Sequence, residues 1–156
     1  MDESTLGTLK QLLTGQRVLS LAVLVDNAPV IGMLPFATAP DFGGVIVHAS
    51  GLARHTKGLG EGAPFEVLIH AADTPDADPL QLPRVTLRGH VGLLARGSDA
   101  YAEDERTYLE RFPSASTTMT LGDFRLYRLV IEGGRLVAGF AQAFNLSQDT
   151  LHKLRA

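Results

Sequence analysis

Short strand-like runs separated by turn residues recur along the chain and constrain its fold more than any other feature. They are rich in aliphatic and β-branched residues, are bounded by Gly, Pro, Asp or Asn, and fall at 17–25, 30–38, 45–49, 64–71, 84–95, 124–131 and 136–144. Because each parallel neighbour needs a crossover of about a dozen residues or more, such connections exclude a doubly wound parallel sheet. We predict a mainly β protein, a small antiparallel barrel that closes its own edges and carries a few flanking helices.

The first two runs have the features of a hairpin with an irregular second strand. The run 17–25 is apolar almost throughout, which predicts a strand covered on both faces. Turn residues at 26–29 join it to the run 30–38 as an antiparallel pair. Pro35 cannot donate to a ladder, so it indicates an edge, a bulge or a place where the backbone turns to meet something else.

Two later runs carry glycine signals. The apolar alternation within 84–95 shifts after Gly89, which predicts a bulge or bend at that residue. The segment 132–135 contains two glycines and predicts a turn that makes 124–131 and 136–144 a closing hairpin.

Helical patterns are confined to a few places. They comprise a helix with a leucine stripe at Leu6, Leu9, Leu12 and Leu13 that Ser4 or Thr5 caps and Gly15 ends, a short stretch at 52–59, a helix over 98–112 that Ser98 caps and Pro113 stops, and a terminal turn at 147–154. The acidic, proline-rich segment 73–83 is expected to be a surface loop, because strands continue on both sides of it. Residues 1–156 are therefore predicted to form a single domain.

Composition excludes several classes of function. The formal charge of −3 and the lack of a basic stripe with interleaved aromatic residues argue against a nucleic-acid partner. The N-terminal segment is acidic and has no long apolar run, so neither a signal peptide nor a membrane span is expected. The lack of cysteine excludes disulfides, a thiolate nucleophile and cysteine-bound metals, and we expect a cytoplasmic location.

Polar and basic residues gather at 50–57 in a chain that has few positive charges. Ser50 could cap a short helix that begins near residue 51, whose free N–H groups and positive dipole end favour a phosphate. Arg54 and Lys57, three residues apart, share one face of that helix, and Thr56 supplies a further donor. The segment is therefore a candidate anion site, although an exposed, solvated helix face explains the same pattern.

His48, His70 and His90 lie near the ends of three expected strands. In a barrel such ends could converge on a metal ion or a haem iron. Their spacing matches no metal-ligand signature, so we expect separate surface or hydrogen-bonded histidines and no metal site.

Candidates for acid–base or nucleophilic catalysis are weak. The carboxylates of 103–105 and Glu110 are contiguous with Arg106 and Arg111, which favours a solvated helix face. No serine lies in a nucleophile elbow. The sequence therefore leaves the catalytic residues unassigned.

Several motifs in order resemble a known family. They are LSLAVLVDNAPVIGMLPFAT, ASGLARHTKGL, PRVTLRGHV, YLERFPSA and DFRLYRLVIEGGRLVAGFAQAF, which together cover roughly residues 8–146. The chain resembles the FMN-binding split-barrel family related to pyridoxamine 5′-phosphate oxidase, and within it the branch that includes haem-utilisation proteins.

The resemblance implies a homodimer of six-stranded antiparallel split β-barrels that binds FMN along the subunit interface. The residues it implies for cofactor binding are Leu34, Pro35, Phe36 and Ala37 beside the flavin ring, Ser50, Arg54, His55, Thr56 and Lys57 at the phosphate, and Arg84 before the next long strand. The flavin would carry the hydride chemistry and the protein would supply orientation and electrostatics. The implied function is that of an FMN-binding flavoprotein, an oxidoreductase acting on a small-molecule substrate.

The chain also departs from the family pattern. The vitamin-processing oxidases carry an arginine and a lysine where this chain has IGMLPFA, which argues against pyridoxamine phosphate as the substrate. Gly58 stands where this branch often has asparagine, which removes an amide contact to the flavin. The alternative function is a non-catalytic module of the same fold that binds a flavin or a haem.

Overall fold

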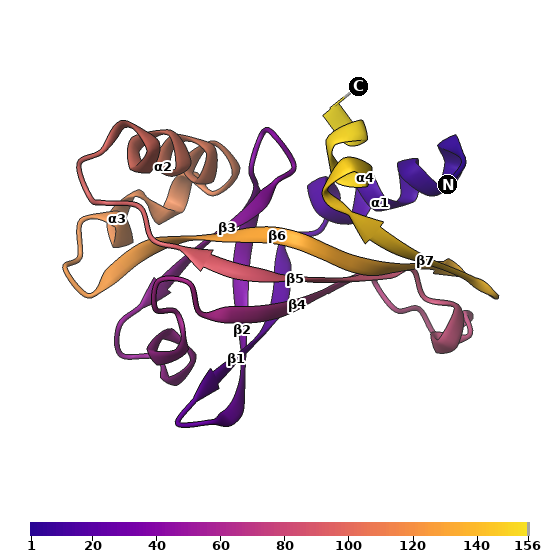
Figure 1. The fold of residues 1–156 in the computed structure, drawn as a ribbon, viewed down its shortest axis with the longest axis horizontal. Helices are drawn as coiled ribbons and strands as arrows, with labels where there is room; N and C mark the ends of the chain where they lie inside the picture. The colour runs from indigo at the N-terminus through magenta and orange to yellow at the C-terminus, as the bar shows by residue number, and fades with distance from the viewer. Residues whose placement is uncertain (156) are drawn as a thin grey trace.

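The fold is a curved antiparallel sheet that closes into a barrel, described for residues 1–155 by a computed structural model (Figure 1). Its strands are β1 (Val18–Val25), β2 (Ala28–Thr38), β3 (Gly44–Ser50), β4 (Pro64–His70), β5 (Arg84–Gly92), β6 (Phe124–Gly139) and β7 (Gln142–Ser147). The order across the sheet is β3-β2-β1-β4-β5-β6-β7, and an additional pairing of β3 with β6 closes the ring. All of these pairs are antiparallel, so the predicted mainly β, six-stranded antiparallel barrel is confirmed, with β7 as an extra strand.

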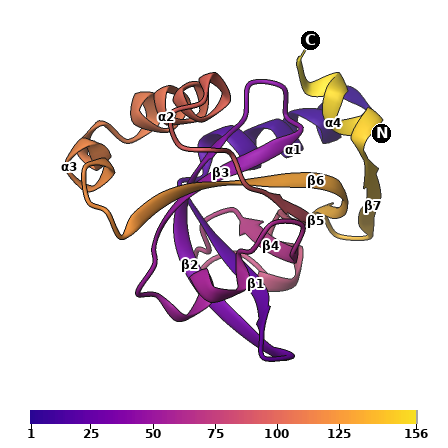
Figure 2. The same cartoon turned by 60° about the vertical axis from the view of Figure 1, so that its left-hand side comes forward.

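The helices lie outside the barrel, and the four α-helices form two groups (Figures 1 and 2). They are the α-helices α1 (Glu3–Gly15), α2 (Asp99–Arg111), α3 (Ser116–Met119) and α4 (Gln148–His152), and the 3-10 turns η1 (Arg54–Gly58), η2 (Pro79–Gln81), η3 (Pro113–Ala115) and η4 (Lys153–Arg155). Helices α2 and α3 lie together at one end, and α1 and α4 lie near both termini at the other. No helix within residues 1–155 is both long and apolar enough to cross a lipid bilayer.

Helix α1 follows its predicted stripe but begins differently. Leu9, Leu12 and Leu13 are buried in the barrel core, as their spacing predicts. The cap is Asp2 and not Ser4 or Thr5, because the Asp2 carboxylate accepts the Thr5 N–H at 2.8 Å. These hydrogen bonds lower the pKa of Asp2.

The β1–β2 hairpin forms as predicted, but one of its faces is open. Asp26 and Asn27 both take positive φ values, of 53° and 59°, which suits the twist of a two-residue hairpin turn. Residues of β1 alternate in burial, and Val18 and Leu24 stay about half exposed. The expectation that this strand is covered on both faces is therefore wrong for the single chain, since its apolar outer face meets solvent.

Later elements confirm two local predictions. The pairing of β5 with β6 shifts register between Arg88 and Gly89, which is the predicted bulge. Ser98 caps α2, since its hydroxyl accepts the Tyr101 N–H at 3.2 Å.

The closing hairpin is displaced from its predicted position. The segment 132–135 lies inside β6, which runs unbroken from Phe124 to Gly139, and the turn comes at Phe140 and Ala141. A Cβ on Gly134 would lie 2.2 Å from the Thr86 carbonyl oxygen of the neighbouring strand. The glycines thus allow close strand approach, and they do not mark a turn.

Helix α2 is fixed to the barrel by a buried ion pair. Asp104 is 1% exposed, and its carboxylate accepts two hydrogen bonds from the Arg128 guanidinium of β6, one of them 2.9 Å long from Nε. Asp104 and its hydrogen bond raise the pKa of Arg128. The expectation that the carboxylates of α2 are all solvated is therefore wrong at Asp104.

Candidate functional site

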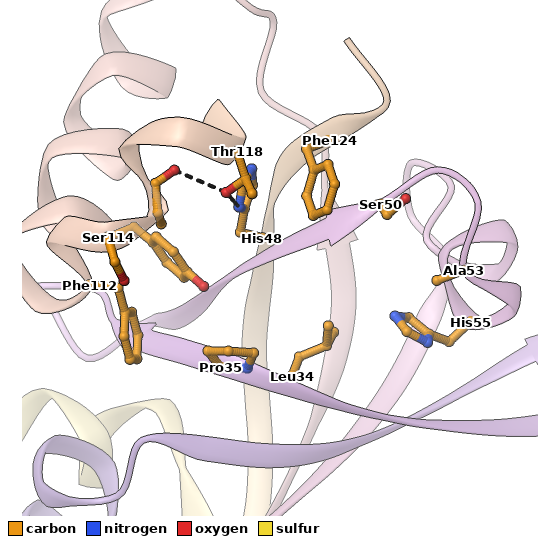
Figure 3. A pocket seen from close by; sticks show the side chains of 12 residues that line it. Leu34, Pro35, His48, Ser50, Ala53, His55, Phe112, Ser114, Thr118 and Phe124 are labelled. Carbon is orange, nitrogen blue, oxygen red and sulfur yellow. Dashed lines mark hydrogen bonds between the residues drawn. The ribbon is translucent and has the colours of Figure 1, made fainter. Parts of the chain in front are cut away.

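A pocket of about 470 Å³ lies where β2 and β3 meet η1 and the segment from α2 to α3 (Figure 3). Its lining residues are Leu34, Pro35, His48, Ser50, Ala53, His55, Tyr108, Phe112, Ser114, Ala115, Thr118 and Phe124. Most of this wall is apolar or aromatic, and the polar groups are imidazoles and hydroxyls. Such a lining suits a flat apolar ligand held by a few specific polar contacts.

Aromatic packing shapes the wall beside α2. Tyr108 and Phe112, one helical turn apart, pack with tilted rings whose centroids are 5.1 Å apart, and both belong to a small core between α2 and the sheet. The His48 ring lies 5.7 Å from that of Tyr108 and 5.0 Å from that of Phe124. Burial raises the pKa of Tyr108 to about 12, so its hydroxyl stays protonated at neutral pH.

His48 comes from the middle of β3 and is 7% exposed. Its Nδ1 lies 3.4 Å from the Thr118 hydroxyl, and its Nε2 is buried without a hydrogen-bond partner within residues 1–155. Burial, and to a smaller extent the charge of Arg96, lowers the pKa of His48. The imidazole is therefore neutral at pH 7.

His55 comes from η1 and packs over β2 at Gly32. A Cβ on Gly32 would lie 2.3 Å from His55 Nδ1, so only glycine leaves room for the ring. The Nε2 atom of His55 is also buried with no partner in the described chain, and burial lowers the pKa of this histidine. In Figure 3 the two histidines stand on different sides of the pocket, His48 beside Thr118 and His55 beside Ala53.

The turn that carries His55 is built differently from the predicted helix. Helical structure begins at Arg54 as a 3-10 turn with Ala53 at its cap position, so Ser50 does not cap it. The Ser50 hydroxyl instead accepts the Leu52 N–H at 3.2 Å and donates to the Asp123 carboxylate at 3.1 Å. The sequence-based argument from a helix N-terminus does not apply to a 3-10 turn of this length.

Four of the predicted cofactor-binding residues meet at the pocket. Leu34, Pro35, Ser50 and His55 line it. Phe36 and Ala37 follow directly on β2 but are buried in the two core clusters.

The predicted cations lie outside the lining. Arg54 and Lys57 are exposed neighbours of His55, and Thr56 between them is buried with an unpartnered hydroxyl. Arg84 donates to the carbonyls of the loop before it and pairs with Val137 near the far end of β6, so the structure does not bring it to this pocket.

Residues of the segment 108–118 form a wall that the sequence-based prediction of the site omits. Tyr108 and Phe112 stand at helical spacing, which core or dimer packing explains without a site, and no sequence motif singles out Thr118. The trace of this wall in the sequence is the segment YLERFPSA, residues 108–115, which is part of the family resemblance.

The branch of the family that this chain resembles often has asparagine at the position of Gly58, and the structure leaves no room for that side chain. A Cβ on Gly58 would lie 2.7 Å from Val23 Cγ2, and the glycine is buried against β1. This departure therefore reflects tight packing of η1 on the barrel.

Comparisons with known proteins agree with this fold. No family model matches the chain. The chain is 26% identical over 145 residues to heme oxygenase HutZ of Vibrio cholerae, a match that covers 92% of this chain and 81% of HutZ.

Solved structures share the fold at lower identity. The heme binding protein of Mycobacterium smegmatis superposes with a TM-score of 0.84 at 20% identity, covering 98% of this chain and 62% of that protein. A second protein of M. smegmatis, which binds FAD and heme, superposes with a TM-score of 0.62 at 19% identity, covering 90% of this chain and 70% of that protein. The chain thus spans about three-fifths of the first of these proteins. The chain is thus similar in sequence to heme oxygenase HutZ and in fold to heme- and FAD-binding proteins, which is consistent with the resemblance to split-barrel proteins related to pyridoxamine 5′-phosphate oxidase.

Proposed function

We propose that the chain binds haem in the pocket around His48 and His55. The observation that carries this proposal is the pair of neutral imidazoles whose Nε2 atoms are buried in a largely apolar pocket without a partner. An unsatisfied buried nitrogen costs free energy, and a ligand that accepts its electron pair removes that cost. Imidazole is a common haem ligand, and an apolar, aromatic lining suits a porphyrin face.

A flavin is the second candidate, favoured by the polar rim of the same pocket. Ser50 and His55 line the pocket, and exposed Arg54 and Lys57 adjoin it on η1, where they could hold a phosphate. Bound FMN would supply hydride chemistry, and the chain would then be an FMN-dependent oxidoreductase acting on a small molecule. The family resemblance and the FAD- and heme-binding relative support this alternative.

Titration of the purified chain with hemin and with FMN, followed by visible absorption, tests both candidates. We expect a Soret band that saturates at one haem per chain, and displacement of either cofactor by an excess of the other if they share the pocket. Exchanging Arg54 and Lys57 together for Ala is expected to weaken FMN by about 2–4 kcal/mol, while Arg106→Ala, an exposed cation of α2, leaves it unchanged. A chain that changes the spectrum of neither compound would contradict both candidates.

We also propose that the chain is a homodimer that pairs through the outer face of β1 and β2. Val18, Leu24, Ile31 and Met33 are exposed on this face, with Ile31 at 74% and Met33 at 70%. Strand register places these side chains side by side and continues the surface to Pro35, which also lines the pocket. A contiguous apolar patch of this kind is typical of an interface, and a partner there would adjoin the cofactor site.

Changing Ile31 and Met33 together to Asp is expected to convert the dimer to a monomer in analytical ultracentrifugation. Each side chain contributes about 1.5–3 kcal/mol when it is buried, so the dissociation constant should rise by roughly 100-fold or more. The matched control changes Leu80 and Phe140, each 79% exposed and outside the patch, to Asp. A wild-type chain that sediments as a monomer, or a control that dissociates equally, would contradict this interface.

A further inference from the structure

Two arginines lie against the aromatic ring at one end of the pocket. The guanidinium carbon of Arg17 lies 5.1 Å from the centroid of the Phe112 ring, and that of Arg111 lies 5.8 Å from the same centroid. Phe112 lines the pocket, and Figure 3 shows it at the opposite end from His55. Because an aromatic face attracts a cation, both positive charges are held beside this end of the pocket.

The fold uses only one of these two guanidinium groups. Arg111 donates to the carbonyl oxygen of Thr14 at 2.7 Å and to that of Gln16, which binds it to the end of α1. Arg17 directly precedes β1, and its backbone carbonyl accepts the Phe36 N–H at 3.1 Å. Its side chain is exposed and makes no hydrogen bond within residues 1–155, so its N–H groups are available to a ligand.

No acidic side chain of the described chain neutralises this pair of cations. Neither arginine forms an ion pair within residues 1–155, and Glu110, next to Arg111 in the sequence, is exposed and pairs with neither. Burial, and to a smaller extent the like charge of Arg17, lowers the pKa of Arg111. In a chain whose formal charge is −3, this end of the pocket is therefore a local positive site that a bound anion would stabilise.

We propose that Arg17 binds a carboxylate of the ligand, so that haem lies in the pocket with its two carboxylate side chains toward Phe112; this inference rests on the proposed haem-binding function. A guanidinium presents its N–H donors in a planar fork that matches the two oxygens of a carboxylate. Packing over a ring leaves this fork accessible at the edge of the guanidinium. The macrocycle then lies on the apolar lining between Phe112 and η1.

The cations of η1 are the competing anion site. Arg54 and Lys57 are exposed at the other end of the pocket, and neither lies over an aromatic ring of the described chain. Fixing such side chains around a ligand costs more conformational entropy than using one that already packs on a ring. A haem held by Arg54 and Lys57 would lie in the opposite orientation.

Titration of the full chain with hemin and with hemin dimethyl ester, followed at the Soret band, tests the assignment. The ester keeps the iron and the macrocycle but lacks both carboxylate charges. We expect Arg17→Ala to bind hemin roughly tenfold or more weakly than the wild type does, and to bind the ester as the wild type does.

Two further variants make the comparison specific. Arg17→Lys keeps the charge but not the planar fork, so its hemin affinity should lie between those of the wild type and Arg17→Ala. Arg106→Ala removes an exposed cation of α2 that contacts no ring, and it should match the wild type with both compounds. Thermal unfolding verifies that all variants are folded.

The outcomes separate this inference from the proposed function. If the wild type shows no Soret band with hemin, the haem function fails and the inference fails with it. If hemin binds and Arg17→Ala matches the wild type, haem binding stands and the role of Arg17 is overturned. If Arg17→Ala weakens hemin and its ester equally, Arg17 acts by packing on Phe112, and carboxylate binding is overturned.

Discussion

Asp104→Asn is expected to lower the free energy of unfolding by roughly 3–5 kcal/mol, measured by urea denaturation of the purified chain. The change keeps the side-chain shape but removes the carboxylate charge that the Arg128 guanidinium hydrogen-bonds, at a site where Asp104 is 1% exposed. Removing one partner of a buried ion pair costs this much because the other charge stays desolvated. The substitution should also weaken the packing of the pocket wall, since Asp104 anchors the helix that positions Tyr108 and Phe112.

Two comparisons make this expectation specific. Glu103→Gln removes an exposed carboxylate of the same helix turn and should change stability by less than about 0.5 kcal/mol. Exchanging both partners, Asp104→Leu with Arg128→Met, should recover most of the loss, because no buried charge is then left unpaired. An Asp104→Asn variant as stable as Glu103→Gln would show that the pair does not hold α2 on the barrel.

The barrel was predictable because its signals are local. Turn residues at 26–29 and the apolar runs around them specify the first hairpin, and Gly89 marks the bulge of β5. Short connections then permit only antiparallel neighbours. A closed barrel, here joined between β3 and β6, is the economical solution under these constraints. The exposure of β1 was not predictable, because no local pattern distinguishes an exposed apolar face from a covered one.

The site was predictable only where one strand or turn carries it. Pro35 is marked in the sequence as an irregularity of its strand, whereas His55 was expected at the cofactor from the family resemblance alone. His48 contacts Thr118, which lies 70 positions away in the sequence and is carried by α3. Burial and hydrogen bonding at such a distance leave no periodic trace, and the spacing of His48, His70 and His90 matches no metal-ligand signature.

A pair of adjacent glycines can indicate either a hairpin turn or a close contact between two strands. A Gly-Gly pair between two apolar runs is typical of a hairpin turn, which is why the segment 132–135 was interpreted as one. Neither Gly133 nor Gly134 has a positive φ in the structure, whereas the true turn at 140–141 places Ala141 at a φ of 56°. Close approach between strands requires the lack of a Cβ as much as a turn does, and sequence alone cannot separate these causes.

Gly134→Ala is therefore expected to destabilise the chain by about 3 kcal/mol or more, at the upper end of the range for overpacking. The added Cβ would lie 2.2 Å from the Thr86 carbonyl oxygen and 3.2 Å from Leu87 Cα, so relief requires separation of two hydrogen-bonded strands of the barrel. Gly60→Ala is the matched control, because no atom lies within 4 Å of its Cβ position. Urea denaturation measures the difference in stability. If Gly134→Ala does not fold, a lower yield of soluble protein than that of Gly60→Ala takes its place. Equal stability of the two variants would contradict the close strand contact. It would instead favour the turn that the sequence predicts for the segment 132–135.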